Sequence, residues 1–433
     1  MLLAEIESNG TKFQLNQEFL NVTFALSDEI SIDENAAAEL ILNASDNFNR
    51  LSLVGIQGGI VSFHLRRQYI LDLVRFLLST SDEEYTDQLN TKFKSFVQRL
   101  VAPYKNESLL SRTLRDMKEI ENTFVALQEK ESRGTFLGQL ESREFVETLK
   151  MRRDFLLSEH DALGQILTSL IEYDHVDLTK DIATIFTHVQ SVDAYNTVLL
   201  HYIPAIAQIG LRLDPNQSVE PASLSFNDIL KVKTIFKDEK AWKLQYWRGA
   251  VQLIYYTYAA GLHRTKSYEG ENLKDVDFKT DILDPIKEAI DAGAFELLLF
   301  IASDINPSET QFEPFFDFRP QLQFYVSPYK SLGKLSENFL ALLFTALERL
   351  AEAIITNTAD ILREMRLNEE DMYLANAQNE VYQDGEDPVG VDLERFFIFI
   401  SCLYNGRPDA AIQFWSDTDN DLYGFIQWAS QCD

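Results

Sequence analysis

Histidine and cysteine, the side chains that most often bind metals or carry catalysis, are few in this sequence of 433 residues. No two of the six histidines have the spacing of a metal site with a second histidine or a cysteine nearby. They are His64, His160, His175, His188, His201 and His263. Cys402 lies in an apolar segment, where a buried and unreactive thiol is expected. The sequence therefore predicts neither a metal site nor a catalytic thiol.

A nucleotide site is not expected either. The glycine-rich segment 55–59 lacks the spacing and the following Lys-Ser or Lys-Thr pair of a phosphate-binding loop, and we expect a loop before a helix. The 68 acidic residues bring carboxylates together by chance, so paired carboxylates do not indicate acid–base catalysis. We therefore predict that the protein is not an enzyme, with no catalytic residue and no cofactor.

Two groups of side chains have the chemistry of binding rather than catalysis. Arg66, Arg67 and Arg75 form a small basic cluster, which could make salt bridges to neighbouring helices or contact an acidic partner. Four aromatic residues near the C-terminus are candidate anchors for a bound segment, with core packing as the alternative. These aromatic residues are Phe414, Trp415, Phe425 and Trp428.

Charge limits the class of partner. The formal net charge is −29, whereas surfaces that bind nucleic acid or anionic membranes are basic, so we expect no direct contact with nucleic acid. The longest uncharged stretch, 194–211, contains Asn196, His201 and Gln208 and is too polar for a transmembrane helix. We therefore expect no insertion into a membrane.

The elements that position these groups are predicted to be helices. Apolar residues recur at helical spacing in segments 160–173, 178–190 and 192–209, which are joined by short polar pieces. Short connections favour antiparallel neighbours, and two helices with their loops occupy about 35 residues, as in helical-repeat arrays. The predicted fold is all-α: one continuous solenoid of antiparallel helix pairs over residues 1–433, with insertions near 306–332 and 368–390.

Two predicted helices illustrate the signals. In segment 60–78, the apolar stripe of Phe63, Ile70, Val74 and Leu77 predicts the face that packs on the array. In segment 337–356, Ser336 stands where an N-cap residue belongs.

Several segments resemble one family. The longest group lies near the C-terminus, two segments lie near the N-terminus, and a weaker echo lies between them. They are 391–396, 404–411, 414–415 and 424–430; 36–42 and 63–72; and 291–296. Their sequences and their order are similar to the N-terminal region of the large inner-ring scaffold nucleoporins, the 192/205-kilodalton family of the nuclear pore complex.

The resemblance implies a superhelical array of HEAT- and armadillo-like helices without enzymatic activity. It also implies a peripheral place at the nuclear pore complex of the nuclear envelope, and a scaffold that binds other nucleoporins, especially short segments of flexible linker nucleoporins. Family members are several times longer, so we expect this chain to be an N-terminal fragment. The alternative function is that of a karyopherin-like soluble nuclear transport receptor, which would bind a small GTPase and phenylalanine-glycine repeats instead.

Overall fold

The protein is helical almost throughout, as the sequence predicts, and a single two-stranded hairpin precedes the first helix. The computed structural model describes residues 5–8, 11–14, 17–48, 56–79, 87–105, 107–136, 143–192, 198–213, 226–268, 276–306, 335–379, 392–416 and 425. These residues form two compact units: unit 1 comprises residues 1–80 and 116–166, and unit 2 comprises residues 81–115 and 167–433. The continuous solenoid over 1–433 stays a prediction.

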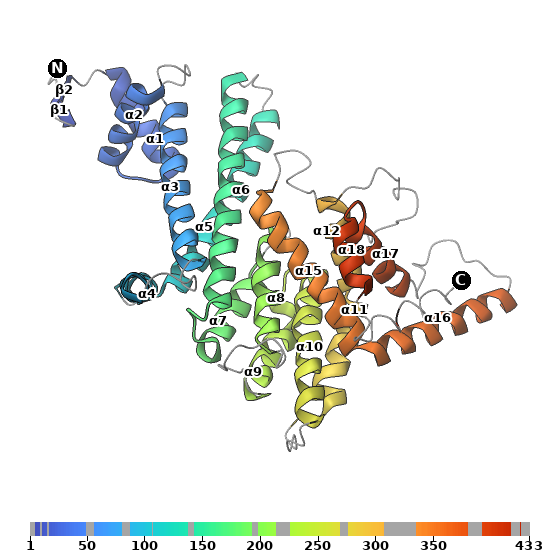
Figure 1. The fold of residues 1–433 in the computed structure, drawn as a ribbon. Helices are drawn as coiled ribbons and strands as arrows, with labels where there is room; N and C mark the ends of the chain where they lie inside the picture. The colour runs from blue at the N-terminus through green and yellow to red at the C-terminus, as the bar shows by residue number, and fades with distance from the viewer. Residues whose placement is uncertain are drawn as a thin grey trace. The chain divides into compact units, whose positions relative to one another are not determined.

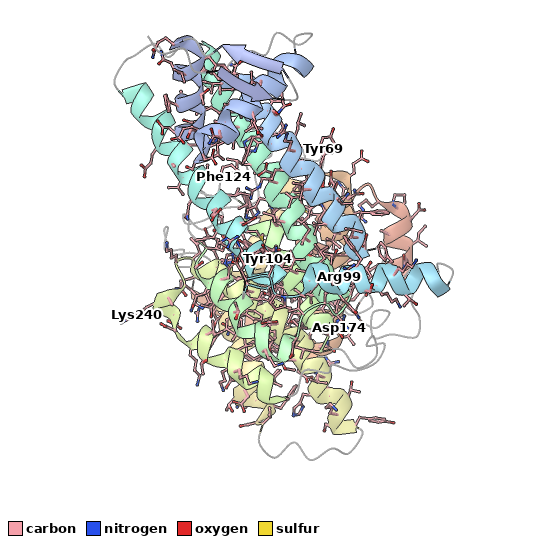
Figure 2. All side chains as sticks on the ribbon, turned by 90° about the vertical axis from the view of Figure 1, so that its left-hand side faces the viewer. Tyr69, Arg99, Tyr104, Phe124, Asp174 and Lys240 are labelled. Carbon is pink, nitrogen blue, oxygen red and sulfur yellow. The ribbon has the colours of Figure 1, made fainter. Side chains whose placement is uncertain are left out.

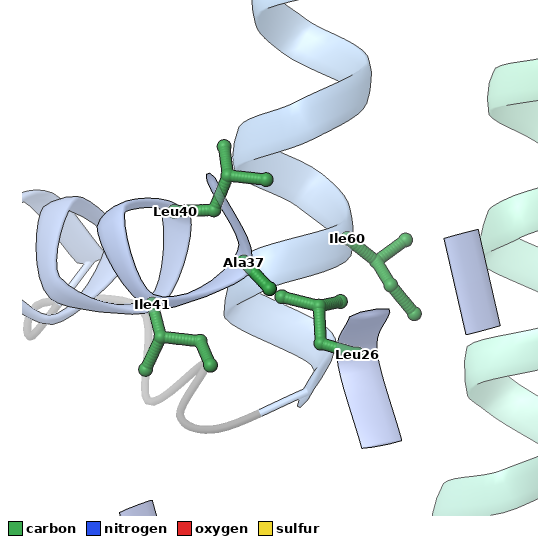
Figure 3. Packing of buried hydrophobic residues seen from close by; sticks show 5 residues of the cluster. All are labelled: Leu26, Ala37, Leu40, Ile41 and Ile60. Carbon is green, nitrogen blue, oxygen red and sulfur yellow. The ribbon is translucent and has the colours of Figure 1, made fainter. Parts of the chain in front are cut away.

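Unit 1 begins with strands β1 (Glu5–Ser8) and β2 (Thr11–Gln14), which pair antiparallel. Three helices follow, α1 (Gln17–Ile30), α2 (Glu34–Phe48) and α3 (Ile56–Ser79), and each of the three contacts the other two. Their shared core is a cluster of aliphatic side chains, shown in Figure 3: Leu26, Ala37, Leu40, Ile41 and Ile60. Burial of this apolar area stabilises the three-helix arrangement.

The glycines at the start of α3 are part of the helix, so the predicted loop over 55–59 is wrong from Ile56 onward. The reason is packing. A Cβ atom at position 59 would lie 2.3 Å from Cδ2 of Leu26, so only glycine lets this core side chain approach the helix so closely. The glycine run therefore serves helix packing.

Two long helices contribute to both units: α5 (Leu109–Phe136) and α6 (Arg143–Glu172). Within unit 1, side chains of α6 form hydrogen bonds with α3, for example Gln57 Nε2 to Thr148 Oγ1 at 2.7 Å.

Unit 2 is built around helix α10 (Gln245–Tyr268), which contacts helices α8, α9, α11, α12 and α15 (Figure 1). Every residue of α10 from Tyr246 to Ala260 is buried. A helix that is buried on all faces must be surrounded by other elements, and this explains why its apolar residues are not confined to one stripe. Trp247, Tyr255 and Tyr256 are among the largest fully buried side chains.

The other helices of unit 2 follow the chain order and cover the two ends of this core. They are α4 (Asp87–Val101), α7 (Leu178–Gln190), the 3₁₀ helix η2 (Leu199–Tyr202), α8 (Ile203–Leu211), α9 (Phe226–Lys237), the 3₁₀ helix η3 (Glu239–Ala241), the π-helix η4 (Lys279–Leu283), α11 (Asp284–Asp291), α12 (Ala294–Ile305), α15 (Glu337–Asn357), α16 (Ala359–Asn379), α17 (Asp392–Tyr404) and α18 (Pro408–Ser416).

Two predicted segments differ from the structure. The helix expected over 192–209 begins at Leu199 as a 3₁₀ turn, and α8 begins at Ile203, with Pro204 in its first turn. Proline has no N–H to donate, and it therefore suits a helix start. The insertion expected near 368–390 is helical as far as Asn379, in α16, because no glycine or proline interrupts that part. Residues 380–390, and all but Asn306 of the other insertion near 306–332, lie outside the described residues.

Candidate partner-binding surfaces

Two of the four C-terminal aromatic candidates are buried. Phe414, in α18, is 2% exposed and its ring centroid lies 4.6 Å from that of Tyr404. Phe425 is 7% exposed and its ring contacts that of Phe397 at 5.7 Å between centroids. This burial favours core packing, the alternative that the sequence left open. The side chain of Trp415 and the whole of Trp428 lie outside the described part, so their partner-binding role stays a prediction.

One member of the basic cluster belongs to a buried polar network inside unit 1. Arg67 Nε lies 3.1 Å from Oε2 of Glu159, and Arg67 Nη2 lies 3.4 Å from Oδ2 of Asp116. The same glutamate is 1% exposed, and its Oε1 lies 2.7 Å from Nδ1 of His64, which is 2% exposed. His64 is therefore a structural residue with a carboxylate partner, as the sequence predicts.

The rest of the basic cluster divides in the same way. Arg75 Nη1 donates to Oε1 of Gln165 at 2.7 Å, and Arg75 Nη2 lies 3.7 Å from Oδ1 of Asp72. Arg66 is exposed. Two of the three arginines thus have partners within the chain, which confirms the salt-bridge interpretation for Arg67 and Arg75.

Helix α3 presents a row of large apolar side chains to water. Tyr69, Ile70, Leu73 and Phe76 are 72%, 62%, 57% and 56% exposed, and their spacing of i, i+1, i+4 and i+7 places them on one side of the helix. Figure 2 labels Tyr69 on this helix. We call these four residues the α3 row. Clustered exposure of this kind is typical of an interaction surface, whereas single exposed apolar residues need no explanation.

Sequence reasoning missed the α3 row because it placed Ile70 on the buried face. The side chains of α3 that are buried include Ile60, His64, Leu71 and Leu78. A second apolar row on the same helix was the available signal, since a helix with one buried face needs only one apolar stripe.

A groove of about 520 Å³ lies within unit 2, between α4, the start of α5 and the connection from α6 to α7. We call it the α4–α7 groove. Its floor contains buried apolar side chains from three elements, namely Val97, Leu110, Leu170 and Val176. Its lining also includes three carboxylates and one lysine, namely Asp174, Asp177, Asp181 and Lys94. Figure 2 shows the side of the molecule on which Asp174 and helix α4, marked by Arg99, lie.

The carboxylates of the groove are in different states. Hydrogen bonds from Lys180 and Thr179 lower the pKa of Asp177. Burial raises the pKa of Asp181, and the nearby charge of Asp177 raises it further. Asp174 adopts a positive φ of 56°, a conformation that asparagine and aspartate tolerate better than most residues. The groove thus combines an apolar floor with an excess of negative charge at its rim.

The thiol of Cys402 is buried, as predicted, and burial raises its pKa, which disfavours the reactive thiolate. Among the residues that the structure describes, no three His, Cys, Asp or Glu side chains come together in a way that could hold a metal ion. In the same part of the chain, no helix is both long enough and apolar enough to cross a membrane.

Comparison with known proteins gives one consistent result. The family model Nup192, described as nuclear pore complex scaffold, nucleoporins 186/192/205, matches residues 4–433. The chain is 27% identical over 447 residues to nucleoporin NUP192 of Chaetomium thermophilum, a match that covers 97% of this chain and 24% of that protein. It is 23% identical over 437 residues to nucleoporin nup186 of Schizosaccharomyces pombe, covering 98% of this chain and 26% of that protein. The chain therefore spans about a quarter of the length of these relatives.

Proposed function

The chain belongs to the nuclear pore complex scaffold family of nucleoporins 186/192/205, and we propose that it is a structural scaffold of the pore's inner ring that holds other nucleoporins in place. The observation that carries this proposal is the family match, which runs along nearly the whole chain. The proposed place of work is the nuclear pore complex at the nuclear envelope. The proposed activity is binding rather than catalysis.

We propose further that the partners include short, partly apolar segments of flexible linker nucleoporins. Helical proteins accept such segments on apolar helix faces through a few anchor contacts. The α3 row offers a face of this kind, because four large apolar side chains at helical spacing are each more than half exposed. Trp415 and Trp428 remain candidate anchors of a second contact.

The α3 row is suited to a partner because the fold of unit 1 does not depend on it. Truncation of an exposed side chain changes the free energy of unfolding by about 0.5 kcal/mol or less. Truncation of an interface anchor costs binding about 2 kcal/mol or more, which is about 30-fold in the dissociation constant. The two roles can therefore be separated by experiment.

The test is calorimetric titration of linker nucleoporin fragments into the intact chain and into the double variant Tyr69→Ala, Leu73→Ala. The matched control is Leu367→Ala, Ile412→Ala, which truncates two apolar residues that are 60% and 64% exposed on α16 and α18. We expect binding to weaken at least about tenfold in the α3 variant and to stay unchanged in the control. All three proteins should unfold at the same denaturant concentration.

Two outcomes would count against parts of the proposal. Binding that survives in the α3 variant would remove the α3 row and leave the scaffold function standing. If no linker fragment binds the intact chain, the proposed binding activity of this region is wrong. Binding of a small GTPase and of phenylalanine-glycine repeats in its place would identify a transport receptor.

A further inference from the structure

We propose that the α4–α7 groove is a peptide-binding site, which takes a short segment of a partner protein bearing one bulky apolar side chain next to a lysine or arginine. The inference rests on the proposed binding of flexible segments and deepens it, because it names a second surface in unit 2 and the chemistry of the segment that fits there.

The floor of the groove accounts for the apolar side chain. Val97, Leu110 and Leu170 are 1%, 3% and 0% exposed, so they form a continuous apolar base held by three different elements. The volume of about 520 Å³ is within the range of about 300–1,000 Å³ that is typical of ligand pockets. An aliphatic or aromatic side chain that enters would exclude water from this base.

The rim of the groove accounts for the basic residue. Asp177 already has Lys180 and Thr179 as partners. No hydrogen bond or ion pair to a described residue accompanies the half-buried carboxylate of Asp181 or the exposed carboxylate of Asp174. Lys94 is the single cationic side chain among the lining residues, against three carboxylates. This imbalance complements a partner that brings a cation.

The electrostatics of Asp181 support the same partner. Burial, together with the charge of Asp177, raises the pKa of this carboxyl group, so its ionised form is disfavoured while the groove is empty. A lysine ammonium or arginine guanidinium beside it would favour the ionised form again. An apolar floor gives nothing to a small hydrated cation, and the occupant must therefore supply both an apolar and a basic group. A short peptide segment does so with two neighbouring residues.

The test uses a phage-displayed library of random twelve-residue peptides, selected on the intact chain. Peptides are counter-selected on the double variant Asp174→Asn, Asp181→Asn, which removes two charges at constant size. Asparagine also tolerates the positive φ at position 174. The matched control is Asp371→Asn, Asp409→Asn, which neutralises two exposed aspartates outside the groove.

We expect the selected peptides to share a bulky apolar residue next to lysine or arginine. The most enriched peptide, made synthetically, should bind the double variant about 2- to 30-fold more weakly, the range for loss of two partly exposed ion pairs. It should bind the control as tightly as the unchanged chain, and its affinity should fall as salt rises. Ala102→Trp, which changes an exposed lining residue and fills the groove without touching the carboxylates, should abolish binding.

Three results would overturn the proposal: no enrichment, enriched peptides without a basic residue, or equal binding to the unchanged chain and to Ala102→Trp. The proposed function fails separately. Linker nucleoporin fragments that bind every groove variant normally would leave the scaffold function intact and exclude the groove as the place where they bind.

Discussion

Replacing Glu159 by alanine should destabilise unit 1 more than any exposed glutamate replacement, because this buried side chain joins two helices. Its carboxylate is 1% exposed and contacts His64 Nδ1 at 2.7 Å and Arg67 Nε at 3.1 Å. Removing one partner of a buried pair costs about 3–5 kcal/mol. Arg67 is 29% exposed and keeps Asp116 at 3.4 Å, so water and Asp116 compensate part of its loss. His64 is 2% exposed and loses its acceptor. We therefore expect the lower end, about 3 kcal/mol.

The measurement is urea unfolding, with hydrogen exchange of the α3 and α6 amides to locate the loss within unit 1. The control is Glu39→Ala, on the exposed side of α2, which should change the free energy of unfolding by about 0.5 kcal/mol or less. A double-mutant cycle with His64→Ala isolates the contact. We expect a coupling of about 1.5–3 kcal/mol, as for a buried hydrogen bond to a carboxylate.

Two results would refute this reasoning. Unfolding of Glu159→Ala at the same urea concentration as Glu39→Ala would mean that the pair is not desolvated. Additive effects of the two substitutions in the cycle would mean that His64 and Glu159 do not interact in solution.

Two further predictions concern unit 2. Gly249→Ala should lower stability by about 1–3 kcal/mol in a thermal melt, because the new Cβ would lie 2.7 Å from the backbone oxygen of Ala289 on α11. Burial raises the pKa of Glu369 from 4.5 to about 7, and the charges of Asp392 and Glu394 also raise it. The folded protein then holds a proton that the unfolded chain has released, so stability should fall as the pH rises from about 4.5 to about 7. Glu369→Gln should remove that part of the slope in unfolding measured across this range; an unchanged slope would contradict it.

Local signals in the sequence were enough to predict where several helices lie. The hydroxyl of Ser336 accepts a hydrogen bond from Phe339 N at 3.2 Å, and α15 begins at the next residue, as the predicted N-cap requires. Its end at Asn357 agrees with the predicted segment 337–356 to within one residue. These features depend on residues within a few positions of each other, and such information is present in a single sequence.

Features that depend on residues far apart in the sequence were not predictable in this way. The α4–α7 groove joins residues 94–110 to residues 170–181, and no local pattern relates the two segments. The burial of Phe414 and Phe425 is of the same kind, because a C-terminal aromatic residue reads equally as core or anchor until its neighbours are known.

The orientation of α3 shows how polar contacts decide what an apolar pattern leaves open. The helix has apolar residues on two sides, and apolar contacts are non-directional, so either side could pack inward. Three hydrogen bonds to α6, each 2.7 Å long, fix its rotation within unit 1: Gln57 to Thr148, His64 to Glu159 and Arg75 to Gln165. These contacts recur along about 27 Å of helix, at 1.5 Å per residue. Hydrogen bonds require direction as well as distance, and rotating the helix would leave buried polar groups without partners. The side that carries the α3 row must then face water, so the buried polar residues of α3 determine which apolar surface is available to a partner.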